Sequence, residues 1–116
     1  MWRRILASFF VVSAATAAPL EPAGTMPMPG VKGRIDHFAV DVAGRRLFVA
    51  ALGNDTVEVF DVEANRHVRS LRGFGEPQGV LYVPTSRRLF VANATADRVD
   101  MLDGQSLEPL ARIAKL

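Results

Sequence analysis

Arg34, Asp36 and His37 are the residues of this sequence best suited to contact a ligand. They fall within four consecutive positions, and an imidazole can act as a base or as a ligand near neutral pH. Gln78 joins them as a weaker candidate, because it holds in a second repeat the position that Asp36 holds in the first. A simpler interpretation is a lone histidine that is hydrogen-bonded to a nearby loop, and the sequence leaves both open.

The other polar residues match no catalytic or metal-binding pattern. His67, the only other histidine, lies far from His37 on a predicted outer strand, and no cluster of Asp, Glu or His has the spacing of metal ligands. The serines lack the Gly-x-Ser-x-Gly pattern, and no glycine-rich strand-to-helix loop could bind phosphate. The absence of cysteine excludes a disulfide, a thiolate nucleophile and cysteine-linked haem. We therefore expect no catalytic residue, no metal and no cofactor in this chain.

An internal repeat determines the expected fold. The hexapeptide Arg-Arg-Leu-Phe-Val-Ala occurs at positions 45–50 and again at positions 87–92. The same offset relates residues 57–61 to residues 99–103, and Asp55 to Asp97. A period of about 40 to 45 residues with short apolar strands is typical of β-propeller blades. The sequence therefore predicts an all-β fold of two four-stranded antiparallel blades.

The expected organisation follows this repeat. Residues 18–33 are rich in proline, glycine and methionine, and such a composition predicts an irregular leader. Blade 1 is expected over residues 34–76 and blade 2 over residues 77–116. Apolar runs bounded by turn residues predict strands at residues 37–42, 46–52, 56–62, 67–71, 80–83, 88–94, 98–102 and 110–114. Residues 47–50 are all apolar, which predicts that both faces of their strand are covered.

The repeat separates structural residues from candidate functional ones. Polar residues present in both copies, such as Asp61 and Asp103 or Asp55 and Asp97, are expected to stabilise turns. The paired arginines 45–46 and 87–88 are expected to be solvated charges at hairpins. Arg34, Asp36 and His37 instead correspond to Glu76, Gln78 and Gly79. Because the innermost strands of a propeller line its central channel, we expect the unequal residues near the channel mouth.

The repeat resembles the YVTN-type bacterial β-propeller repeat. The resemblance rests on an Arg-Leu-Phe-Val-Ala strand, a turn of Gly, Asn and Asp, a Val-x-Val-x-Asp type strand, and Pro77-Gln78-Gly79 at the start of the next blade. It extends over about residues 34–116, and residues 33–37 and 76–80 look like the N-terminal part of exported members. It implies a seven-bladed propeller, of which this sequence contains two blades.

Two blades alone would leave two apolar faces uncovered. Three explanations are open: the sequence is a fragment of a longer reading frame, the gene is truncated, or several copies assemble into a closed ring. We favour the first. Closure is thus expected to need further blades of the same chain or self-association.

Residues 1–17 have the pattern of an export signal. Arg3 and Arg4 precede an apolar run at residues 5–12, and Ala15-Thr16-Ala17 matches a cleavage site. The run is too short for a transmembrane helix, so we expect cleavage after Ala17 and a periplasmic or secreted protein with no stable membrane span. Without Arg3 and Arg4 the basic residues equal the 12 acidic ones. Nucleic acid is therefore not an expected partner.

The sequence supports three functional hypotheses. The first is a non-enzymatic scaffold that binds a protein, peptide or small molecule at the channel mouth. The second is the N-terminal part of a propeller enzyme, redox or lactone-hydrolysing, with its catalytic residues on other blades; it depends on an analogy of fold. The third is a self-associating half-propeller.

Overall fold

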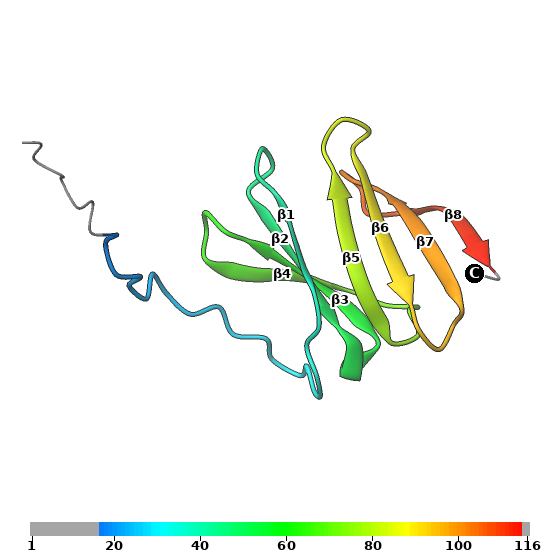
Figure 1. Cartoon of the computed structure of the whole chain (residues 1–116), viewed down its shortest axis with the longest axis horizontal. Coiled ribbons are helices and arrows are strands. Elements are labelled where there is room, and N and C mark those ends of the chain that lie inside the picture. The colour runs from blue at the N-terminus through cyan, green and yellow to red at the C-terminus, as the bar shows by residue number, and fades with distance from the viewer. Residues whose placement is uncertain (1–16, 115–116) are drawn as a thin grey trace, which may run out of the picture.

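The computed structural model describes residues 17–114 and contains two four-stranded antiparallel sheets (Figure 1). Each sheet is a meander, with strand orders β1-β2-β3-β4 and β5-β6-β7-β8. We call the first sheet blade 1 and the second blade 2. The strands are β1 (Phe38–Asp41), β2 (Arg46–Ala51), β3 (Thr56–Asp61), β4 (Arg66–Leu71), β5 (Pro77–Val83), β6 (Arg88–Asn93), β7 (Arg98–Asp103) and β8 (Pro109–Ala114), with one 3₁₀ turn, η1 (Leu52–Asn54).

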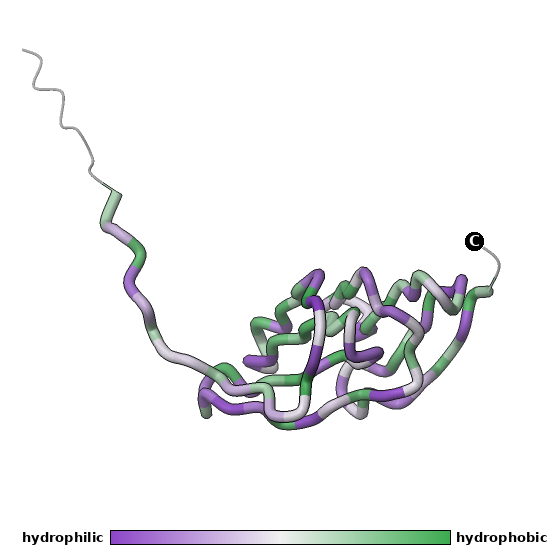
Figure 2. Tube along the Cα trace, turned by 90° about the horizontal axis from the view of Figure 1, so that it is seen from below, coloured by the Kyte–Doolittle hydropathy of each residue, from purple (hydrophilic) through white to green (hydrophobic). Residues whose placement is uncertain are grey.

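This architecture confirms the predicted all-β fold of two four-stranded blades. The main difference is at β5, which begins at Pro77 rather than near residue 80, with an irregular register between Pro77 and Gly79. Residues 17–33 contain no helix or strand and extend from blade 1 on the side away from blade 2 (Figures 1 and 2). The predicted signal peptide lies almost wholly outside the described residues. No helix within residues 17–114 has the length and apolar character needed to cross a membrane.

The repeat extends to the backbone of the turns. Three pairs of non-glycine residues at equivalent positions of the two repeats adopt positive φ angles between 46° and 63°: Arg45 and Arg87, Asp55 and Asp97, Asn65 and Leu107. Asp61 and Asp103 accept hydrogen bonds from backbone N–H groups at the β3–β4 and β7–β8 turns. Their predicted structural role is confirmed. At Asp103 these bonds, from Ser106 and Gln105, hold the pKa of the carboxyl below its ordinary value.

The hydrophobic core lies between the two blades. Residues directly opposite one another in neighbouring antiparallel strands share a face of the sheet. Blade 1 contributes Phe48, Val57, Val59 and Leu71, whereas blade 2 contributes Leu89, Val91, Leu102 and Leu107. The ring of Phe48 stacks on that of Tyr82 at a centroid distance of 5.9 Å. Each blade therefore covers one face of the other.

Arg46 stabilises the contact between the two blades, whereas the sequence predicted a solvated charge at this position. Its guanidinium pairs with Asp41 at 2.7 Å and donates to the carbonyl of Gly104 in blade 2. It also lies 5.2 Å from the ring centre of Phe48 and 5.9 Å from that of Tyr82. Burial alone would raise the pKa of Asp41, but hydrogen bonds from Gly44 and Arg46 outweigh burial and lower it.

The second face of blade 2 is open. Of residues 47–50, which were predicted to be covered on both faces, Phe48, Val49 and Ala50 are buried and Leu47 is half-buried. In β6 fully buried and half-buried residues alternate. The half-buried set includes Phe90, the repeat equivalent of Phe48. Around it the registers place Leu81, Met101, Val99 and Ile113, of which Leu81 is 58% and Ile113 54% exposed. This apolar surface, which we call the open face, corresponds to the face of blade 1 that blade 2 covers.

Candidate functional site

The segment that carries Arg34, Asp36 and His37 is held against the end of β2 by backbone hydrogen bonds. The carbonyl of Arg34 accepts from Gly53 at 2.9 Å, and Asp36 donates to the carbonyl of Ala50 at 3.0 Å. The backbone approaches closely here, because a Cβ added at Gly33 would lie 2.8 Å from Cα of Gly53. Gly33 also has a φ of +77°, which favours glycine. These contacts fix the chain directly before β1.

The three candidate side chains form one connected cluster on this segment. Arg34 donates to Oδ2 of Asp36 at 3.0 Å, and Nδ1 of His37 lies 3.1 Å from Oδ1 of the same carboxylate. The side chains of Arg34 and His37 are 65% and 63% exposed, whereas that of Asp36 is 13% exposed. Asp36 thus orients two exposed groups from a protected position.

His37 also joins the two blades. Its Nδ1 lies 2.6 Å from the main-chain carbonyl oxygen of Gln78 at the start of β5. A carbonyl only accepts hydrogen bonds, so Nδ1 carries the hydrogen and Nε2 of the neutral ring is left as the acceptor. This contact agrees with the simpler interpretation of a histidine bound to a nearby loop. It also leaves Nε2 suited to accept a proton or a hydrogen bond from a ligand.

The structure brings all four predicted site residues together. Gln78 contacts His37 through its main-chain carbonyl oxygen and not through its side chain. Next to His37 is a shallow hollow of about 280 Å³ whose other lining residues come from blade 2, among them Val80, Leu81 and Phe90. Leu81 and Phe90 belong to the open face, so a further blade packed on that face would fill this hollow. The exposed imidazole and guanidinium can bind polar or charged groups of a ligand.

Glu58 is a buried charged residue that the sequence analysis did not single out. Its carboxylate, fully buried, accepts from Thr56 at 2.5 Å and from Ser70 at 2.6 Å, and pairs with Nε2 of His67 at 2.6 Å. Burial alone would raise the pKa of Glu58, but the hydrogen bonds from Ser70, Thr56 and His67 outweigh it and lower the pKa. Both oxygens are therefore engaged within the fold.

Asp100 holds the equivalent position in blade 2 and is also buried. Its partners are Asn93 at 3.0 Å, Arg98 at 3.0 Å and Arg112 at 3.1 Å. A buried carboxylate in the third strand is thus common to both blades, and the acidic residues at positions 58 and 100 were the signal in the sequence. Recurrence in both copies indicates a structural role. Within residues 17–114 no group of three or more acidic, histidine or cysteine side chains is arranged to hold a metal ion.

Comparisons with known proteins agree with this geometry at the level of the fold. No family model and no curated protein match the chain. Among solved structures, hydrazine synthase of Kuenenia stuttgartiensis superposes with a TM-score of 0.61 at 22% identity, over 67% of this chain and 23% of that one. AztD of Citrobacter koseri superposes with a TM-score of 0.63 at 18% identity, and the match covers 78% of this chain and 26% of AztD. The nidogen/laminin complex superposes with a TM-score of 0.57 at 15% identity, and the match covers 66% of this chain and 28% of that one.

The chain therefore spans about a quarter of the length of the solved structures it resembles. At these identities the similarity concerns the fold alone. Together with the internal sequence repeat and the two sheets packed face to face, it shows that the chain is built of β-propeller blades.

Proposed function

We propose that this chain is the two-blade part of an exported propeller of the YVTN type that binds ligands without catalysing a reaction. The observation that carries the proposal is the cluster of Arg34, Asp36 and His37. It is connected and largely exposed, and it occurs in only one of the two repeats. A residue needed for the blade itself would be expected in both copies. The ligand would be a protein, a peptide or a small molecule, and the location the periplasm or the cell exterior.

We also propose that further blades pack on the open face and close the propeller into a ring. The face of blade 1 equivalent to the open face is covered by blade 2, and this chain covers only 26% and 28% of two of the solved structures it resembles. A third blade of the same polypeptide is the partner that best fits the open face, in a ring of seven. Self-association of two-blade units is the alternative, and it would make the melting temperature depend on protein concentration.

The binding site can be tested with ligands selected for it. Peptides selected on the immobilised protein from a displayed peptide library would be measured against wild type and the double variant Asp36→Asn, His37→Ala. We expect binding to weaken by about tenfold or more, since hydrogen bonds to charged groups contribute about 1.5–3 kcal/mol. Circular dichroism should show an unchanged fold, because the side chain of His37 is exposed and asparagine keeps the size and one acceptor oxygen of the protected Asp36.

Arg66→Ala serves as the matched control, because Arg66 is an exposed residue of β4 outside the cluster. Its affinity for the same peptides should equal that of wild type. Peptides that bind the double variant as well as wild type would place recognition elsewhere on the molecule. The site proposed here would then be wrong.

A further inference from the structure

Blade 1 has a second face, which points away from blade 2 and which we call the away face. Successive side chains of a strand point to opposite faces of the sheet. Phe48 packs against blade 2, so Val49 and Ala51 of the same strand fall on the away face with Leu47 or in its alternation. Phe60 belongs to this face too, because it lies directly opposite Leu47.

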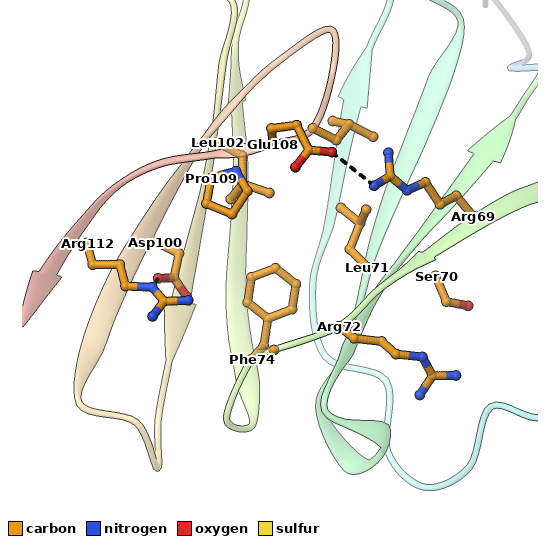
Figure 3. Close-up of a pocket in the computed structure, with 12 residues that line it drawn as sticks. Arg69, Ser70, Leu71, Arg72, Phe74, Asp100, Leu102, Glu108, Pro109 and Arg112 are labelled. Carbon is orange, nitrogen blue, oxygen red and sulfur yellow. Dashed lines mark hydrogen bonds and ion pairs between the residues drawn. The ribbon is translucent and has the colours of Figure 1, made fainter.

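Strand β4 and the buried carboxylate of Glu58 fit this assignment. In Figure 3 the side chain of Leu71 lies on the side of blade 2, whereas that of Ser70 points away from blade 2. Ser70 donates a hydrogen bond to Glu58, which lies opposite Val49 in the sheet. The away face therefore also contains Glu58, which is fully buried.

The away face is buried at β2 and β3 although blade 2 lies on the other side of the sheet. Val49, Ala51 and Phe60 are each no more than 3% exposed. The open face of blade 2 shows the behaviour of an uncovered sheet, because Leu81 and Ile113 are more than half exposed there. A segment other than blade 2 therefore covers β2 and β3 on the away face.

Among residues 17–114, the leader is the segment that lies on this side of blade 1 (Figure 1). It contacts blade 1 at two separate points. The backbone N–H of Lys32 donates to Oδ1 of Asn54 at 3.2 Å, and a Cβ added at Gly24 would lie 3.3 Å from Nδ2 of Asn65. Asn54 precedes β3 and Asn65 follows it. Residues 24–33 therefore run along the length of this strand.

Between these two contacts the apolar side chains of the leader are partly removed from water. Met26 and Met28 are half-buried, whereas the alternate residues Thr25 and Pro27 are exposed. Val31 is half-buried as well, and its N–H donates to the carbonyl of Met28 in a turn. Methionine side chains adapt to irregular apolar surfaces. This alternation indicates that one side of the segment packs on the blade.

We propose that residues 24–33 are a strap, which packs on the away face through its half-buried methionines and valine. Val91 and Leu102, the repeat equivalents of Val49 and Phe60, are covered by blade 1. The strap thus does for blade 1 what a neighbouring blade does for blade 2.

The strap covers only part of the away face. Phe38 and Val40 of β1 lie opposite Val49 and Leu47, and both are more than half exposed. This inner part of the face stays available to the last blade of a closed ring. The strap ends directly before Arg34, so it also fixes the start of the segment that carries the cluster. The inference depends neither on the ligand of that cluster nor on ring closure.

Trypsin cleavage after Lys32 tests whether the strap is docked, because a protease cleaves a folded segment only when it opens. The protein as its gene encodes it would be compared with a synthetic peptide of residues 24–38, with the products identified by mass spectrometry. We expect cleavage after Lys32 to be at least about tenfold slower in the protein than in the peptide. The double variant Met26→Asp, Met28→Asp should be cleaved there at least about tenfold faster than wild type, because docking would desolvate two charges.

Thr25→Asp is the matched control, since it adds the same charge to the same segment at an exposed position. It should be cleaved after Lys32 as slowly as wild type. Wild type cleaved as fast as the peptide, or equal rates for Thr25→Asp and the double aspartate variant, would overturn the proposal.

Cleavage after the arginines of the strands separates undocking of the strap from unfolding of the blades, and it should not change in the double aspartate variant. If it does rise, Met26→Ala, Met28→Ala replaces that variant. This milder change should raise cleavage after Lys32 by about threefold or more, because it removes only apolar contacts. No rise in that variant would equally overturn the proposal.

Discussion

The Phe48→Ala variant is expected to lose about 3–5 kcal/mol of the free energy of unfolding. Phe48 is fully buried at the centre of β2, opposite Ala39 in β1 and Val59 in β3. Its ring also meets Tyr82 of blade 2. Truncation would therefore leave a cavity within the contact between the blades, where neither sheet can collapse without disturbing the other.

Urea unfolding followed by circular dichroism would measure this loss. Leu20→Ala is a suitable control, because Leu20 is fully exposed in the leader and its truncation should change stability by no more than about 0.5 kcal/mol. If Phe48→Ala were as stable as Leu20→Ala, the two sheets would not pack against each other as described.

The second large effect is expected at Glu58. Glu58→Ala should lose about 3–5 kcal/mol of unfolding free energy, because it removes one partner of a buried network and leaves the others unsatisfied. Thr56, Ser70 and His67 all direct polar atoms at this carboxylate. Glu58→Gln retains the shape and one acceptor oxygen, and its loss should be smaller.

The loss at Glu58 should depend on pH. The pKa of Glu58 in the folded protein is below its ordinary value of 4.5, so the carboxylate stabilises the fold fully above that value. As the pH falls below 4.5 the unfolded chain takes up the proton first, and the stabilisation is lost as the pH passes through the folded pKa.

Unfolding of wild type and Glu58→Gln would be measured at neutral pH and well below pH 4.5. The difference in free energy of unfolding between wild type and Glu58→Gln should be constant well above pH 4.5 and become smaller well below it. Asp41 and Asp103 also have lowered pKa values, but both variants contain them, so their contributions cancel. A difference that stays the same throughout this range would show that the network does not hold Glu58 ionised.

The repeat made most of the fold predictable from the sequence. All eight strands were located because their apolar runs recur at the same offset between turn residues, and each copy supports the assignment of the other. Asp61 and Asp103 were assigned to turns for the same reason. The start of β5 was missed, because Pro77 and Gly79 are typical turn residues, and here they join the strand through an irregular register.

Contacts between blades were less predictable, because they depend on how two sheets pack. Arg46 has the same sequence context as Arg88, yet it reaches Gly104 of the other blade, whereas Arg88 pairs with Asp103 of its own blade. The bond from His37 to Gln78 joins two segments that are far apart in the sequence. Nothing in the spacing of these residues indicates such contacts.

The central claim, that these blades belong to a closed propeller, is tested most directly at Phe90. Phe90 occupies on the open face the position that Phe48 occupies on the covered face. The measurement is the free energy of unfolding of Phe90→Asp and Phe48→Asp in the protein as its gene encodes it. If another blade covers the open face, both changes bury a charge, and both should cost at least about 3 kcal/mol. The contradicting result would be a Phe90→Asp protein whose free energy of unfolding is within about 1 kcal/mol of wild type, while Phe48→Asp is strongly destabilised. It would show that the open face is in contact with water and that the propeller is not closed.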